Sequence, residues 1–230
     1  MPEHRAAADE LGRTILSEHQ AAATAVCWLG NIAWLIRAGG RLMAFDLDLD
    51  PGSRLRSSLI TAQALASDLD VQFITHEHGD HFNGPTSAIL SQESSCLFVV
   101  PSSCLTKARE LGVPEERVFV ATPGKPLELP GDVRVSPLRA LHGHRHGMVY
   151  RHANLDDCGY LLSVGGTTFL QPGDTLLLDE HLDHQGVDVL FVSPTEHNMR
   201  VEHSRILIET LQPRFIFPQH YGTYQVTKEN

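Results

Sequence analysis

The sequence of 230 residues lacks the features of a membrane-spanning or disulfide-rich chain. It has no apolar run of about 18 residues or more, so we expect no transmembrane helix. The segment 1–24 carries charges throughout and lacks the apolar core of a secretory signal, so we expect an N-terminal helical extension. Free thiols without a C-x-x-C pair, together with the missing signal, favour a cytoplasmic protein. The cysteines concerned are Cys27, Cys96, Cys104 and Cys158.

Positive charge is also scarce in this chain. It has 18 Lys and Arg residues against 28 Asp and Glu residues, which gives a formal net charge of -10. Such a balance repels phosphate backbones and anionic membrane surfaces, so we expect neither nucleic acid nor a membrane as partner. The expected partner is a small-molecule substrate, and the sequence leaves the formation of an oligomer open.

The chain contains no Ser-, Gly- or Pro-rich linker, no low-complexity tract and no internal repeat that would divide it. We therefore predict a single domain at 25–230. Turns at Gly39-Gly40 and Gly165-Gly166 indicate β-hairpins, and strands alternate with helices elsewhere, which predicts an α/β fold. Strands are expected within 25–30, 33–46, 71–75, 96–101, 118–121, 133–141, 159–174, 187–194 and 214–220, and helices within 57–69, 102–112 and 202–213.

The stretch FITHEHGDHFNG, residues 73–84, carries three histidines, an aspartate and a glutamate within six positions. His76 and His78 are two apart at the end of a predicted strand, so both side chains project from the same face. The glycine that follows lacks a Cβ and permits a change of direction that brings Asp80 and His81 back toward this pair. The pattern H-x-H-x-D-H therefore predicts a compact metal site.

Two other metal motifs do not apply to this chain. The zinc-protease pattern H-E-x-x-H needs a helix and a second histidine, where this chain has an expected loop and an aspartate. The stretch DLDLDPG, residues 46–52, imitates a calcium-binding loop, but Ser57 stands where the bidentate glutamate is needed. For Asp46 we favour a role in the Asp-Pro-Gly turn, with partnership to a metal-bound histidine as the alternative. Asp48 and Asp50 are expected to be solvated.

Ligand-type residues also follow three later predicted strands, namely His142, Asp174 and His220. A strand end followed by a turn residue is where a rigid scaffold presents functional groups. In order and spacing the chain resembles the metallo-β-lactamase superfamily, whose metal-binding motifs appear here as THEHGDH, His142, the GDT of 173–175 and PQHYGTY.

Within that superfamily, the region from Ala25 to Tyr224 resembles the ascorbate-6-phosphate lactonase-like metal-dependent hydrolases. The likeness is carried by WLGNIAWLI, FVVPSSCLTKARELGVPEERV and PQHYGTY. It implies a metallo-β-lactamase-like αβ/βα four-layer sandwich with two mixed β-sheets, and a binuclear metal site. The implied ligands of one ion are His76, His78 and His142, those of the other are Asp80, His81 and His220, and Asp174 bridges the two.

The implied activity is hydrolysis of a small ester or lactone by a metal-bridging hydroxide. Asp80 and His81 are the expected catalytic residues, and Asp80 can orient the nucleophile or take a proton. Zinc is the first expectation for both ions, while manganese or iron also accept this mixture of imidazoles and carboxylates. The alternatives are a phosphodiesterase and a non-catalytic metal-binding or sensing module of the same fold.

The stretch LHGHRHG offers His142, His144 and His146 as rivals for one ligand position. His142 is favoured because it comes first after the strand. His144 and Arg145 are then expected to bind substrate. The surrounding segment 139–152 concentrates arginines in an acidic chain, and arginine binds carboxylate or phosphate through paired hydrogen bonds, so an anionic or phosphorylated substrate is expected.

Overall fold

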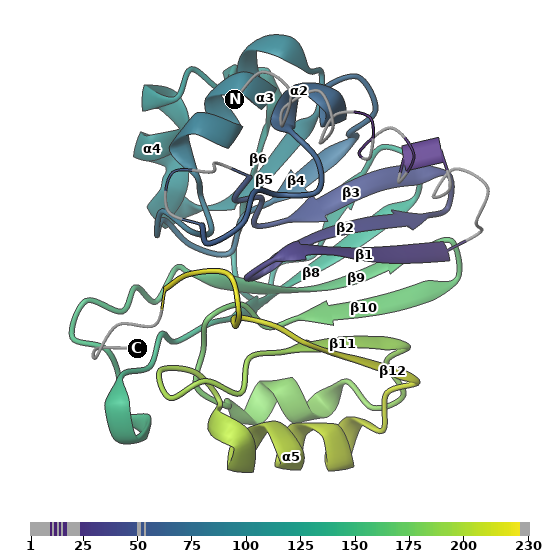
Figure 1. Ribbon diagram of the computed structural model, residues 1–230. Coiled ribbons are helices and arrows are strands. Elements are labelled where there is room, and N and C mark those ends of the chain that lie inside the picture. The colour runs from purple at the N-terminus through teal and green to yellow at the C-terminus, as the bar shows by residue number, and fades with distance from the viewer. Residues whose placement is uncertain are drawn as a thin grey trace.

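The computed structural model describes residues 24–49, 52 and 54–225, together with the helical residues Glu10, Gly12, Thr14, Leu16 and Ser17. Most of the expected N-terminal extension at 1–24 therefore lies outside the described residues. Two mixed β-sheets face each other, and helices cover their outer faces (Figure 1). This arrangement is the four-layer αβ/βα sandwich that the sequence predicts.

The first sheet contains the N-terminal half of the domain. Its strands are β1 (Thr24–Gly30), β2 (Ala33–Ala38), β3 (Arg41–Phe45), β4 (Val71–Phe73), β5 (Leu97–Pro101) and β6 (Val118–Ala121), in that spatial order. β1, β2 and β3 pair antiparallel through hairpins, while β4, β5 and β6 continue the sheet in parallel. Its outer face carries the helices α2 (Ala62–Leu65), α3 (Gly84–Glu93) and α4 (Leu105–Glu110).

The second sheet contains the C-terminal half and mirrors this plan. Its order is β12 (Phe215–Pro218), β11 (Val189–Val192), β10 (Thr167–Gln171), β9 (Cys158–Val164), β8 (Val133–Arg139) and β7 (Leu127–Leu129). β10, β11 and β12 are parallel, and the remaining pairs are antiparallel. The outer face carries α5 (Arg200–Leu211) and short 3-10 turns, of which one spans Asp179–Asp183.

Three apolar layers hold the sandwich together. The middle layer lies between the sheets and contains aromatic side chains such as Phe45, Phe73 and Tyr160. The outer layers bury α2, α3 and α4 against the first sheet and α5 against the second. Because successive side chains of a strand point to opposite faces, β3 supplies Phe45 to the middle layer and Ala44 to an outer one.

Two helices differ from the prediction, one in its extent and one in being absent from it. The helix expected at 57–69 contains only α2, because the side chain of Thr61 accepts a hydrogen bond from Ala64 N and starts the helix there. The helix α3 was not predicted; it starts at Asn83, whose side chain caps Thr86 N. Cys96, Cys104 and Cys158 are buried free thiols, and Cys27 is half-buried and free.

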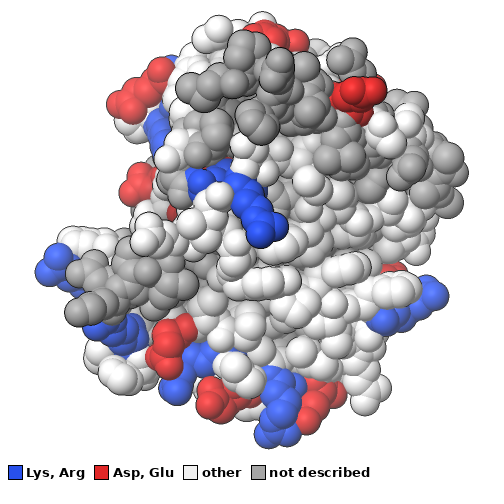
Figure 2. Space-filling view, in the orientation of Figure 1, with Lys and Arg blue, Asp and Glu red and all other residues white. Residues whose placement is uncertain are grey.

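The surface shows no sign of a continuous basic region on the face seen in Figure 2. There, the lysines and arginines of the described residues are separated by acidic and uncharged side chains. In the part of the chain that the structure describes, none of the helices has the length and apolar character needed to cross a bilayer.

The topology places several strand ends together. β3 and β4 are parallel to each other, as are β10, β11 and β12, and β8 runs in the same direction as β10 because both pair antiparallel with β9. The loops that follow these strands gather at one end of the sandwich (Figure 1). These loops hold the residues that the sequence marks as ligands. A rigid pair of sheets therefore supports the site from both sides.

Candidate metal centre

The loop after β4 carries the histidine cluster in a tight turn. The backbone N–H groups of His81 and Phe82 both donate to the carbonyl oxygen of His78, at 3.0 and 2.8 Å. This turn brings His81 back toward His78, as the sequence predicts. Gly79 is not among the residues with positive φ, so the turn does not depend on glycine at that position, contrary to our expectation.

The loop after β10 places Asp174 opposite this cluster. Its neighbour Gly173 has a φ of +73°, and a Cβ there would lie 3.0 Å from Cβ of Thr75 in the loop after β4. Glycine is required at this point because the two loops meet without room for a side chain. Asp174 is thereby held against the loop of the histidine cluster.

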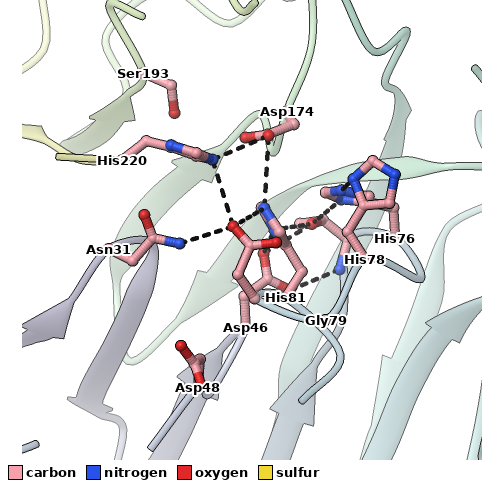
Figure 3. Close-up of polar contacts among 12 residues, drawn as sticks. Asn31, Asp46, Asp48, His76, His78, Gly79, His81, Asp174, Ser193 and His220 are labelled. Atoms are coloured by element: carbon pink, nitrogen blue, oxygen red, sulfur yellow. Dashed lines mark hydrogen bonds and ion pairs between the residues drawn. The ribbon is translucent and has the colours of Figure 1, made fainter. Parts of the chain in front are cut away.

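The seven predicted ligands converge on one spot. In Figure 3, His76, His78 and His81 from the loop after β4 face Asp174 and His220, which come from loops of the second sheet. Each of the two predicted triads has its ligand atoms within 4.8 Å of one another, namely His76, His78 and His142, and Asp80, His81 and His220. Asp174 lies between the triads. Its Oδ2 is 3.5 Å from Nε2 of both His81 and His142 and 3.1 Å from Nε2 of His220.

The spacing of these atoms fits divalent cations. Two ligands bound to one ion at about 2.0 to 2.2 Å each lie roughly 3 to 4 Å apart. Oδ2 of Asp80 is 3.6 Å from Nε2 of His81 and 3.8 Å from Nε2 of His220, too long for hydrogen bonds but suitable for a shared cation. In the described part of the chain, the buried Nε2 atoms of His81 and His220 have no hydrogen-bond partner.

The charges of the cluster favour a cation at its centre. Burial disfavours the charged form of His81, but the surrounding carboxylates, with Asp80 the strongest, raise the pKa of His81 well above its ordinary value. Burial would raise the pKa of Asp174, yet the imidazoles of His220 and His81 hold it well below its ordinary value. Burial and the neighbouring imidazoles keep the pKa of His76 well below normal, so His76 is neutral and able to bind a metal.

Asp46, the residue after β3, supports the histidine cluster through hydrogen bonds to the loop after β4. Its carboxylate accepts hydrogen bonds from the backbone N–H and the hydroxyl of Thr75, at 2.8 and 2.7 Å, and lies 3.0 Å from Nδ1 of His81. The side chain is fully buried. The favoured role in an Asp-Pro-Gly turn is therefore wrong, and the alternative of a partner to a metal-facing histidine fits the contacts.

Asp48 is also buried, although the sequence suggested a solvated side chain. Its carboxylate accepts hydrogen bonds from Asn83 Nδ2 at 2.8 Å and from the hydroxyl of Tyr224, and it pairs with Arg54 at 3.9 Å. Asn83 and Tyr224 come from distant parts of the chain, and together with Arg54 they cover the aspartate. Asp50 lies outside the described residues.

Two buried asparagines orient the carboxylates of the cluster, and sequence reasoning missed both. Asn31, in the turn between β1 and β2, donates from Nδ2 to Oδ2 of Asp80 at 3.0 Å (Figure 3). Asn198, in the loop after β11, donates from Nδ2 to Oδ1 of Asp174 at 3.1 Å. The second bond leaves Oδ2 of Asp174 free to face the imidazoles.

His197 is a further residue of this region that the sequence reasoning missed. Its Nε2 lies 3.8 Å from Oδ2 of Asp174. The signal was present, because His197 follows the predicted strand at 187–194, just as the other ligands follow theirs. The prediction considered only residues placed directly at a strand end.

The positions of His142, His144 and His146, in the segment after β8, show which of them can be a metal ligand. His142 joins the first triad, while His144 and Arg145 are exposed, and neither His144 nor His146 belongs to a candidate metal group of the described residues. His144 remains near the site through the ring of Tyr150, whose centroid lies 6.0 Å from that of His144 and 5.3 Å from that of His142.

The basic character of this segment is partly neutralised. Arg139 forms an ion pair at 2.8 Å with Glu180 of the adjacent 3-10 turn, and this pair neutralises its charge. Of the arginines expected to attract an anion, Arg145 is the one that follows the His142 ligand position most closely.

Comparisons with known proteins agree with this geometry. A sequence model described as "Beta-lactamase superfamily domain" matches residues 49–221. A UPF0173 metal-dependent hydrolase from Carboxydothermus hydrogenoformans is 31% identical over 215 residues, which cover 87% of this chain and 86% of the relative.

Solved structures show the same fold at lower identity. Igni18, a metallo hydrolase from Ignicoccus hospitalis, is 18% identical with a TM-score of 0.66 over 86% of this chain and 83% of that chain. CmlA, a diiron β-hydroxylase from Streptomyces venezuelae, is also 18% identical with a TM-score of 0.66, over 86% of this chain and 45% of that chain. Together with the family match, these findings show that the chain belongs to the metallo-β-lactamase superfamily, as a metal-dependent hydrolase of the UPF0173 family.

Proposed function

We propose that this chain is a binuclear hydrolase that cleaves small anionic esters or lactones, including phosphorylated ones. The observation that carries the proposal is the position of Asp174. Its Oδ2 lies within 3.5 Å of imidazole nitrogens from both triads, namely those of His142, His81 and His220. A carboxylate placed in this way is suited to hold two cations side by side.

Two divalent cations in these triads would lower the pKa of a shared water and polarise the bond to be cleaved. The chain's own residues set up the geometry of this reaction. His76, His78 and His142 hold the first position, and Asp80, His81 and His220 hold the second. No serine or cysteine nucleophile is needed.

Asp80 and His81 are the residues we assign to the catalytic step. The side chain of Asp80 is 32% exposed, so among the two carboxylates of the cluster it is the one open to an incoming substrate. The imidazoles of His81 and His220 outweigh the effect of burial and lower the pKa of Asp80, which keeps the carboxylate ionised and suited to orient the nucleophile. His81 is fully buried, and as a ligand of the second ion it fixes the place at which Asp80 acts.

Zinc is the metal we propose for both positions, because five imidazoles and two carboxylates suit its preference for nitrogen and oxygen ligands. Iron and manganese remain the alternatives. The description of CmlA as a diiron enzyme supports iron, because CmlA shares this fold.

His144 and Arg145 are the residues we propose for substrate recognition. Both are exposed, and they follow His142 directly in a segment that also holds the ring of Tyr150 over His142. A guanidinium at this position suits a carboxylate or phosphate on the substrate. The resemblance of sequence motifs such as PQHYGTY to lactonase-like hydrolases and the charge of the segment are the two grounds for proposing an anionic ester or lactone.

The test is a substrate screen with metal-loaded protein. We expect turnover of anionic lactones or nitrophenyl esters, and loss of that turnover in Asp80→Asn, which keeps the size of the side chain but removes its charge. Turnover of bis-nitrophenyl phosphate alone would instead identify a phosphodiesterase. Tight metal binding without turnover of either panel would contradict catalysis and indicate a sensing module.

A further inference from the structure

The loop between β11 and α5 places a histidine beside the second triad. His197 directs its ring into the cluster: its Nε2 lies 3.8 Å from Oδ2 of Asp174, and its ring centroid is 4.8 Å from that of His220. The ligand atoms of Asp174, His197 and His220 all lie within 4.8 Å of one another. This third triad shares two members with the proposed site.

The loop is built to hold His197 in this position. The next residue, Asn198, is fully buried and donates to Oδ1 of Asp174 at 3.1 Å and to the hydroxyl of Thr195 at 3.0 Å. On the other side, a Cβ on Gly143 would lie 2.7 Å from the carbonyl oxygen of His197. The backbone of His197 is therefore packed against the segment that carries His142 and tied to the carboxylate of Asp174.

The distance from His197 to Asp174 is similar to the distances between the predicted ligands. The separation of 3.8 Å between His197 and Asp174 is too long for a hydrogen bond and equals the separation between His220 and Asp80. Two ligands of one cation lie roughly this far apart. The side chain of His197 is 27% exposed, more than the 13% of His220, so it lies on the solvent side of the cluster.

We propose that His197 is an additional metal ligand, which joins Asp174 and His220 at the second ion. The inference rests on the proposed binuclear site and extends it. With His197, the second ion has five protein ligands instead of four, whereas the first keeps four. The two positions therefore differ in coordination number. The second exceeds the four ligands usual for zinc, which can expand its coordination shell to five.

The experiment titrates metal-free full-length protein with Co²⁺ and records the visible absorption and the affinity for each ion. Co²⁺ absorbs more strongly when its coordination number is lower. We expect His197→Ala to weaken binding of one ion by about tenfold or more, the range seen when support of a metal ligand is lost. The absorbance per ion of that weakened site should rise, and binding of the other ion should stay unchanged.

His203→Ala is the matched control, because His203 is exposed on α5 and lies outside the candidate metal groups of the described residues. It should bind both ions as wild type does. Free imidazole should restore the spectrum of His197→Gly, because the partly exposed position admits it. Should His197→Ala fail to fold, as judged by circular dichroism, His197→Gln carries the same expectation.

The outcomes separate this inference from the function beneath it. Wild-type protein that binds two ions and turns over substrate, with an unchanged spectrum and affinity in His197→Ala and His197→Gln, would overturn the role of His197 alone. Wild-type protein that binds fewer than two ions would overturn the binuclear site and the His197 proposal together.

Discussion

The carboxylate of Asp46 lies 3.0 Å from Nδ1 of His81, on the side of the ring opposite to Nε2, which faces Asp80 and Asp174. A hydrogen bond at Nδ1 fixes the tautomer of an imidazole and leaves Nε2 available as a ligand. Thr75 holds the same carboxylate from two sides. Asp46 therefore determines how His81 is presented to the site.

Asp46→Asn is expected to weaken metal binding by about 10- to 100-fold, because an amide supports the His81 ring less well than a carboxylate. The backbone of Asp46 has a φ of 43°, which asparagine tolerates, so the fold should be retained. Competition with a coloured chelator measures the affinity. Asp70→Asn is the control, since Asp70 bonds Leu42 N and Arg41 far from the site. Equal affinities in Asp46→Asn and wild type would show that the carboxylate of Asp46 does not support metal binding through His81.

Asp174→Ala is expected to abolish turnover while the fold persists. The change removes the carboxylate shared by both triads, so the loss in kcat/KM should exceed about 100-fold, the upper end for an outer partner. The three apolar layers supply most of the stability and do not include Asp174. Circular dichroism should therefore show a retained fold in the same variant that has lost turnover. A parallel loss of both would indicate that Asp174 acts as a structural turn residue.

Asp157 is expected to make stability depend on pH. Burial raises the pKa of this aspartate from 3.8 to about 6. The protonated form is thus favoured by folding, and its contribution is complete below pH 3.8 and is lost as the pH rises through about 6. Ser103 donates to its Oδ1 at 2.8 Å, and an asparagine keeps that acceptor.

Asp157→Asn should therefore raise the free energy of unfolding at pH 7.5 by about 1 to 2 kcal/mol, after a discount for partial solvent screening. The difference from wild type should vanish below about pH 4. Urea unfolding at both pH values, in the presence of a chelator, measures it. Asp156→Asn, at an exposed neighbour, is the matched control for the loss of one carboxylate. A destabilised Asp157→Asn at pH 7.5 would rule out this explanation.

Arg145→Ala tests the proposed recognition of an anionic substrate. The loss of the guanidinium should raise KM for anionic substrates several-fold and leave KM for neutral analogues unchanged. Steady-state kinetics on matched pairs of substrates provide the comparison. Arg139→Ala is the control, because Arg139 already pairs with Glu180. An equal rise in both KM values, or none, would remove Arg145 from substrate recognition.

The sequence predicted which residues come together at the candidate site, because each one follows a strand. His76, His78 and His81 are set by local spacing, and His142, Asp174 and His220 by the ends of strands that the topology brings together. The mixed sandwich followed from the alternation of strands and helices and from the likeness to the superfamily.

The surroundings of the ligands could not be predicted in the same way. Asn31 and Asn198 reach Asp80 and Asp174 across 49 and 24 residues of chain. Asp48 looked solvated because its partner Tyr224 is 176 residues away. Such contacts depend on how loops of two sheets pack, which neither periodicity nor spacing encodes.

The most direct test of the account is the number and position of the metal ions. Elemental analysis of protein purified without added metal, followed by anomalous scattering from crystals, measures both. We predict two ions per chain, one within reach of His76, His78 and His142, the other of Asp80, His81 and His220, with Asp174 between them. A saturated protein with one ion and an unliganded His220 would contradict the binuclear centre.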